Sequence, residues 1–131
     1  MENFRVLIVD DELDFLETIL IRLQRRNVDA VGVSSGKMAI EMIEREHFDV
    51  AILDVRMPGI DGFETLREIK KRRPFMEVIM LTGHGSVESG IQGMQMGAFD
   101  YVLKPVKIDD LLDRVRKAFE RKAIHEKKSG R

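Results

Sequence analysis

Residues 5–12 read RVLIVDDE, an apolar run followed directly by adjacent acidic residues. Two further apolar runs in the chain are also followed directly by a charged residue. Asp54 follows VAIL and Lys104 follows YVL, so these two residues, like Asp10 and Asp11, come directly after apolar runs. If the runs are buried parallel strands, their carboxyl ends share the edge of the sheet where open α/β folds bind ligands. We therefore expect the four side chains to converge.

The composition fits one domain with one core. The chain has 131 residues, of which 44% are hydrophobic and 34% charged, and this length is close to that of a common single domain. The net charge of -1 gives no reason to expect direct nucleic-acid binding by this segment. No cysteine is present, which excludes a disulfide framework and a thiolate metal site.

No part of the sequence predicts contact with a membrane. The apolar runs are far shorter than the roughly 18 residues needed to span a bilayer. The chain does not open with a basic segment followed by an apolar one, as a secretion signal would. We expect a soluble, cytoplasmic protein.

Short apolar segments alternate with amphipathic ones about five times, which predicts βα repeats and a parallel sheet covered on both faces. The expected strands cover residues 4–9, 29–33, 49–53, 77–81 and 100–103. The segments between them carry apolar residues at helical spacing, as does a last helix from about Ile108. The fold class is therefore α/β.

Two of the expected helices carry further signals. Asp61 followed by Glu64 predicts a capping box at the start of the third helix, which the basic residues before Pro74 should end. The fourth helix, over residues 86–96, contains Gly90 and Gly93, and each interior glycine costs about 0.8–1 kcal/mol of helix propensity against alanine. This helix should be marginal, either as a local weakness or as a segment able to shift.

Three carboxylates in one pocket require a counterion. At about 5 Å and an effective dielectric of about 20, each pair repels by about 3 kcal/mol, so the cluster must bind protons or a cation. Mg²⁺ suits a short list of carboxylate ligands. Asp10 or Asp11 could instead cap the following helix, and Asp54 could belong to the turn before Pro58, but two adjacent acids exceed what a cap requires.

Four sequence elements together resemble the receiver domain of bacterial two-component response regulators. They are DD at 10–11, DVRMPGIDG at 54–62, LTG at 81–83 and KP at 104–105. The resemblance implies a flavodoxin-like, doubly wound five-stranded parallel sheet in the order 2-1-3-4-5 with helices on both faces. It places the receiver domain at residues 1–122 and leaves residues 123–131 as a basic polar tail or the start of a linker.

The resemblance assigns the phosphoryl chemistry to specific residues. Asp54 would be the phosphoacceptor, a carboxylate nucleophile. Mg²⁺ would be bound by Asp10, Asp11, Asp54 and the backbone carbonyl of Arg56, and it would neutralise the transferring oxygens. A sensor histidine kinase or a small phosphodonor would supply the phosphoryl group.

The remaining implied roles concern the response to phosphorylation. Lys104 would pair with a phosphoryl oxygen, and the hydroxyl of Thr82 would donate to another. Tyr101 would be the aromatic switch residue that turns inward with Thr82. It could also be an ordinary half-buried strand aromatic, and both interpretations can be true. The Lys104–Pro105 peptide bond would be cis.

The implied function is a phosphorylation-activated signalling switch rather than an enzyme. The fourth helix, fifth strand and fifth helix would form the surface that controls an output domain or partner, including a possible homodimer. The stretch LTGHGSVE at 81–88 is most similar to the nitrogen-regulatory (NtrC-like) subgroup, in which an ATPase and a DNA-binding domain normally follow and transcription is regulated.

Three alternative functions compete with this interpretation. Acidic strand ends with Mg²⁺ also occur in phosphohydrolases of the haloacid-dehalogenase type, but those have Asp-x-Asp after the first strand. Nucleotide binding would need a P-loop or a G-x-G-x-x-G sequence there, and the chain has neither. A receiver-like interaction module that takes no phosphate is the third alternative, and labelling by acetyl phosphate distinguishes all three.

Overall fold

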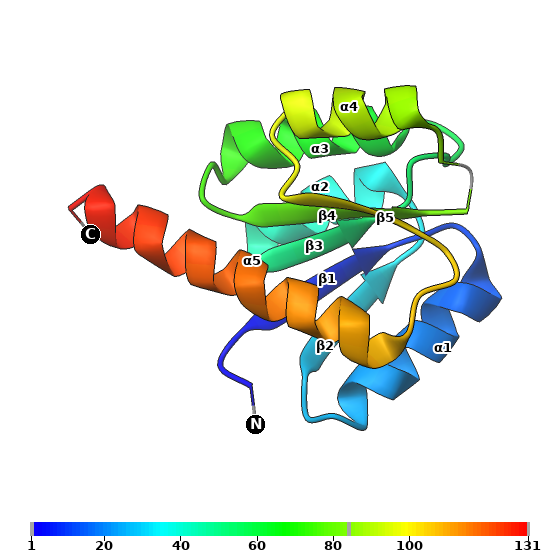
Figure 1. Ribbon diagram of the computed structural model, residues 1–131, viewed down its shortest axis with the longest axis horizontal. Coiled ribbons are helices and arrows are strands. Elements are labelled where there is room, and N and C mark those ends of the chain that lie inside the picture. The colour runs from blue at the N-terminus through cyan, green and yellow to red at the C-terminus, as the bar shows by residue number, and fades with distance from the viewer. Residues whose placement is uncertain (1, 84, 131) are drawn as a thin grey trace.

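The structure is a computed structural model that describes residues 2–83 and 85–130, and within these ranges five strands alternate with five helices (Figure 1). The strands are β1 (Arg5–Val9), β2 (Asp29–Val33), β3 (Val50–Leu53), β4 (Glu77–Thr82) and β5 (Asp100–Leu103). The helices are α1 (Leu13–Gln24), α2 (Gly36–Arg45), α3 (Gly62–Arg72), α4 (Val87–Gln95) and α5 (Ile108–Lys128). Each strand lies within one residue of its predicted bounds.

The strands form one parallel sheet in the order β2-β1-β3-β4-β5, as expected. β1, β3 and β4 are the inner strands, and their residues are almost fully buried, because helices cover both faces of the sheet. Val9 pairs with Leu53, and Leu53 pairs with Met80. This register brings the carboxyl ends of three neighbouring strands to the same edge.

The alternation of side chains along each strand divides the core into two layers. Ile8 and Ile52 pack with α1 and α5, whereas Leu7 and Leu53 pack with α2 and α3. α4 lies on the same side as α2 and α3, beside β5 (Figure 1). Only Gly93 of α4 is buried, so this helix is attached by little apolar surface.

The helix starts follow from local sequence. Asp61 accepts the N–H of Glu64 while Glu64 accepts the N–H of Asp61, so the predicted capping box of α3 is confirmed. The side chains of Ser35 and Ser86 cap α2 and α4 more simply, each by accepting one backbone N–H, from Met38 and Ser89 respectively. α4 therefore begins and ends one residue inside its predicted bounds.

α5 continues past the sheet, and its later turns are held by buried charges (Figure 1). Lys122 lies 3.0 Å from Asp49, and Arg121 binds Glu77 through two nitrogens. Asp49 comes directly before β3, and Glu77 is the first residue of β4. Both pairs therefore lie at the amino end of the sheet. The helix crosses residues 122–123, the boundary expected for the tail, without a break; Met1 and Arg131 lie outside the described residues.

None of the helices in the described part of the chain has both the length and the apolar character needed to cross a membrane.

Candidate functional site

Four of the predicted residues lie at the carboxyl edge of the sheet. Asp10 follows β1, Asp54 follows β3, Thr82 ends β4 and Lys104 follows β5. Asp10, Asp54 and Thr82 are buried, and the backbone fixes their positions: the N–H of Asp54 donates to Val9 O and the N–H of Lys104 donates to Thr82 O. The Lys104–Pro105 peptide bond is cis.

The ammonium of Lys104 brings the acidic residues together. Its Nζ lies 2.7 Å from Asp10 Oδ2, 3.0 Å from Glu12 Oε1 and 3.9 Å from Asp54 Oδ2. It also lies 4.0 Å from the centre of the Phe15 ring, a distance at which a cation is attracted to the face of an aromatic ring. Residues separated by up to 94 positions therefore share one site.

The carboxylates closest to one another include one that was not predicted. Among the described residues, Asp10, Glu12 and Asp54 each offer an oxygen within 4.8 Å of the others. Asp11, predicted as a metal ligand, is not in this group; its exposed side chain lines the adjoining cavity. The N–H of Glu12 donates to Asp10 Oδ1 at 2.9 Å, and this short turn keeps residues 10 and 12 close together.

The charge of the group favours a cation. Three carboxylates and one ammonium leave two negative charges, which a divalent ion would balance. Asp54 Oδ1 is buried and accepts no hydrogen bond from the described residues. Burial raises the pKa of Asp10, and hydrogen bonds from Lys104 and from the N–H of Glu12 do not fully offset it.

Lys104 remains a cation in this setting. Burial by itself lowers the pKa of its ammonium, but hydrogen bonds to Asp10 and Glu12 and the charge of Asp54 outweigh that effect and raise the pKa. The site therefore combines a fixed positive charge with excess negative charge.

A cavity of about 570 Å³ adjoins Asp54. Asp11, Glu12, Arg56 and Asp61 line it, together with Ser89 from α4. The cavity is large enough for a hydrated ion and a phosphoryl group, and one of its walls is the helix with the weakest attachment.

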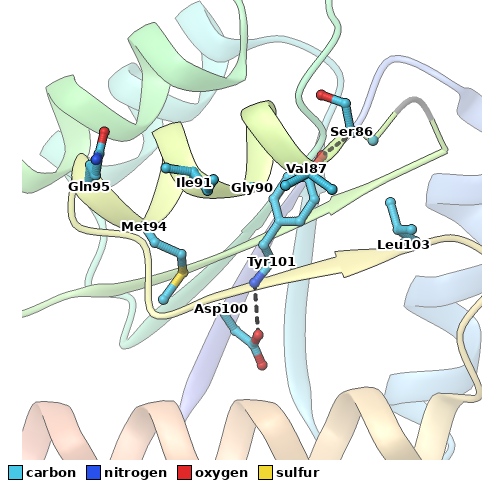
Figure 2. A pocket seen from close by; sticks show the side chains of 10 residues that line it. Ser86, Val87, Gly90, Ile91, Met94, Gln95, Asp100, Tyr101 and Leu103 are labelled. Atoms are coloured by element: carbon cyan, nitrogen blue, oxygen red, sulfur yellow. Dashed lines mark hydrogen bonds between the residues drawn. The ribbon is translucent and has the colours of Figure 1, made fainter.

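Tyr101 lies beside α4 on the far side of β5 from α5 (Figure 2). Its hydroxyl accepts a hydrogen bond from the N–H of Ser86 at 3.3 Å, and a Cβ on Gly90 would meet its ring at 3.1 Å. An apolar cavity of about 790 Å³ between α4 and β5 is lined by exposed side chains that include Val87, Ile91 and Leu103.

Comparison with known proteins agrees with this geometry. Residues 6–116 match the family described as the response regulator receiver domain. The chain belongs to this family. The receiver domain is 33% identical over 117 residues to the transcriptional regulatory protein ZraR of Escherichia coli strain K12, a match that covers 89% of this chain and 26% of ZraR.

Two further relatives support the NtrC-like resemblance of the receiver domain. The response regulator protein PilR of Pseudomonas aeruginosa is 37% identical over 118 residues, which are 90% of this chain and 26% of PilR. The crystal structure of NtrX from Brucella abortus superposes with a TM-score of 0.89 at 28% identity, covering 98% of this chain and 29% of that chain. The receiver domain thus spans about a quarter of the length of ZraR and of PilR.

Family membership establishes the function at the level of the domain. The receiver domain is a phosphorylation-activated switch of a two-component system, and such domains receive phosphate from histidine kinases and bind Mg²⁺ at an acidic pocket. The described residues contain an acidic group at the carboxyl edge of the sheet, formed by Asp10, Glu12 and Asp54.

Proposed function

We propose that Asp54 is the phosphoacceptor. Its carboxylate would attack phosphorus, forming an acyl phosphate as the bond from phosphorus to the kinase histidine or to a small donor such as acetyl phosphate breaks. The observation that carries this proposal is the position of Asp54: a buried carboxylate at the end of β3 with Lys104 3.9 Å away and a cavity in front of it.

We propose that Mg²⁺ binds here through Asp10, Asp11, Asp54 and the backbone carbonyl of Arg56. When bound, it would neutralise the oxygens between which charge moves during transfer. The excess negative charge, the raised pKa of Asp10 and the unpaired Asp54 Oδ1 support a cation at this site. Asp54 would be the nucleophile in phosphorylation, and in dephosphorylation water would attack phosphorus and release the Asp54 carboxylate. The chain would thus assist both reactions on itself without being an enzyme on another substrate.

Lys104 and Thr82 would recognise the attached phosphoryl group. Hydrogen bonds to charged groups contribute about 1.5–3 kcal/mol each, so the two together could supply roughly 3–6 kcal/mol. Reversing a two-state equilibrium from 1:99 to 99:1 requires about 5.5 kcal/mol. The contacts from Lys104 and Thr82 can reverse the equilibrium only if the conformational change itself costs little free energy. Movement of α4 should cost little, because this helix has two interior glycines and one buried residue.

Tyr101 would couple Thr82 to the output surface. We propose that it turns inward when Thr82 moves toward the phosphoryl group, which would release the N–H of Ser86 at the start of α4 (Figure 2). The surface formed by α4, β5 and α5 would then engage an output domain, a partner or a second copy. Its exposed apolar residues, among them Val87 and Leu103, support an interaction role.

At the level of the whole protein, we propose a regulator of transcription in the cytoplasm, because ZraR is named a transcriptional regulatory protein. We assign residues 1–122 to the receiver and 123–131 to a tail or linker. The low net charge supports nucleic-acid contact by another part of such a protein rather than by this segment.

Labelling with acetyl phosphate in the presence of Mg²⁺ tests the acceptor. We expect Asp54→Asn to abolish labelling without loss of the fold, whereas Asp14→Asn, which changes an exposed acid in the first turn of α1, keeps it. Labelling of Asp54→Asn at the wild-type level would assign the phosphoryl group to another residue.

Amide chemical shifts with and without beryllofluoride test the switch. We expect changes over residues 86–103, which include α4 and β5. Unchanged shifts there, with changes confined to the residues around Asp54, would exclude this surface as the output face.

A further inference from the structure

Lys104 does not form a hydrogen bond with Asp54 in the resting site. Its ammonium donates to Asp10 and to Glu12, at 2.7 and 3.0 Å, whereas Asp54 Oδ2 is 3.9 Å away. An ammonium has three protons to donate, and two of them are directed to the end of β1. Lys104, which should recognise a phosphoryl group on Asp54, is therefore held closer to Asp10 and Glu12 than to Asp54.

Asp10 is expected at this position, but Glu12 has no assigned role. It is the N-cap residue of α1, yet its side chain caps nothing, and glutamate is not among the preferred capping residues. Its backbone N–H donates to Asp10 Oδ1 at 2.9 Å, which fixes the backbone so that the side chain reaches Lys104. The main polar contact of the Glu12 side chain is thus Lys104.

Binding of a phosphoryl group would place Glu12 in competition with it. With its bonds to Asp10 and Glu12 intact, Lys104 has one proton left for a phosphoryl oxygen on Asp54, and the hydrogen bond to Glu12 opposes the movement that would bring that proton closer. The Glu12 side chain is 57% exposed, so it can return to solvent at little cost once Lys104 moves. The buried Asp10 cannot make that exchange.

We propose that Glu12 is a positioning residue that holds Lys104 on the Asp10 side in the resting state and weakens the hold of the site on a phosphoryl group. Phosphorylation would transfer Lys104 from Glu12 to the phosphoryl oxygen. Glu12 would act on the phosphoryl group indirectly, through the position of Lys104. The strength of the Glu12–Lys104 hydrogen bond would then set how strongly the phosphorylated conformation is favoured over the resting one. This inference depends on the proposed function of Asp54.

Beryllofluoride, a phosphoryl mimic, measures that hold directly. At saturating Mg²⁺, checked by titration for each variant, we expect Glu12→Gln to bind beryllofluoride about three- to tenfold more tightly, because the competing charge-assisted hydrogen bond is lost. Asp14→Asn removes an exposed acid two residues away on the same helix and should leave the affinity unchanged.

A double-mutant cycle separates a contact with Lys104 from a general charge effect. In a Lys104→Met background, Glu12→Gln should change the affinity by less than about twofold, because the shared partner is gone. A second measurement needs no Lys104 variant. The NMR signals of the Lys104 side-chain ammonium in the unphosphorylated protein should differ between the wild type and Glu12→Gln.

Two outcomes would overturn the inference alone: an unchanged affinity of Glu12→Gln, or an equal gain in the Lys104→Met background. A wild-type protein that neither binds beryllofluoride nor accepts label from acetyl phosphate would overturn the proposed function as well.

Discussion

The ammonium of Lys122 lies 3.0 Å from the carboxylate of Asp49, at the edge of the sheet opposite to Asp54. Both side chains are more than nine-tenths buried. Asp49 also accepts the N–H of Arg5 at 2.8 Å. The pair therefore fastens the later turns of α5 to the start of β3.

Replacing Lys122 should destabilise the fold. Lys122→Met keeps most of the apolar stem but leaves Asp49 buried without its cation, which typically costs about 3–5 kcal/mol. Lys127→Met, on an exposed part of the same helix, should change the free energy of unfolding by less than about 0.5 kcal/mol. Urea unfolding measures the free energy of unfolding of both variants. Equal losses in the two would show that the buried Lys122–Asp49 pair contributes no more to stability than an exposed lysine does.

The same pair predicts a pH dependence. Burial lowers the pKa of Lys122, but hydrogen bonds to Asp49 and Glu126 and their charges outweigh it, so the pKa is raised above 10.5. A raised pKa of a base means stabilisation that is complete below pH 10.5 and lost as the pH rises through the folded value. From neutral pH upward, the difference in unfolding free energy between wild type and Lys122→Met should therefore persist until the solution is strongly alkaline. A difference that already shrinks near neutral pH would contradict the assignment of the effect to the charge of Lys122.

Asp10→Asn should stabilise the protein in the presence of a chelator. Burial raises the pKa of Asp10, so the ionised carboxylate at neutral pH costs stability. Each neighbouring carboxylate repels it by about 3 kcal/mol, and the lost pairing with Lys104 offsets part of the gain, so we expect roughly 1–2 kcal/mol. Thermal unfolding with EDTA and then with Mg²⁺ checks this: Mg²⁺ should stabilise the wild type more than the variant. Equal Mg²⁺ stabilisation of both would exclude Asp10 from the metal site.

The two glycines of α4 should respond differently to alanine. A Cβ at Gly93 would lie 3.6 Å from Met80 Cγ, an ordinary contact, so Gly93→Ala should gain up to about 0.8–1 kcal/mol of helix propensity. A Cβ at Gly90 would lie 3.1 Å from the Tyr101 ring, so Gly90→Ala should displace the ring and weaken its bond to Ser86.

Hydrogen exchange of α4 amides, together with thermal unfolding, measures this contrast. Gly93→Ala should slow exchange across the helix, and Gly90→Ala should speed it near Ser86. Identical behaviour of the two variants would show that Tyr101 does not support the start of α4.

Much of the fold was predictable because its signals are local. Asp61 and Glu64 form their capping box within four residues, and the strands are bounded by changes from apolar to charged residues. The convergence of Asp10, Asp54 and Lys104 followed from one geometric rule about parallel strands. The strand order, in contrast, came from the family resemblance, since periodicity does not specify which strands are neighbours.

The features that sequence reasoning missed depend on side-chain direction or on distant pairing. Glu12 could have been found from its spacing of two from Asp10, because an aspartate side chain often accepts the N–H of the residue two positions later, as Asp10 does here. The pairing of Asp49 with Lys122 joins residues 73 positions apart in the sequence, and no local pattern selects one lysine among several on a polar helix.

The length of α5 gives it mechanical leverage. Its 21 residues form a rod of about 31 Å at 1.5 Å per residue. A pivot of about 5° around the first turns would displace the far end by roughly 3 Å. The attachments at Lys122 and Arg121 resist such a swing, so their stiffness limits how much of a small rearrangement near Asp54 reaches the C-terminal turns.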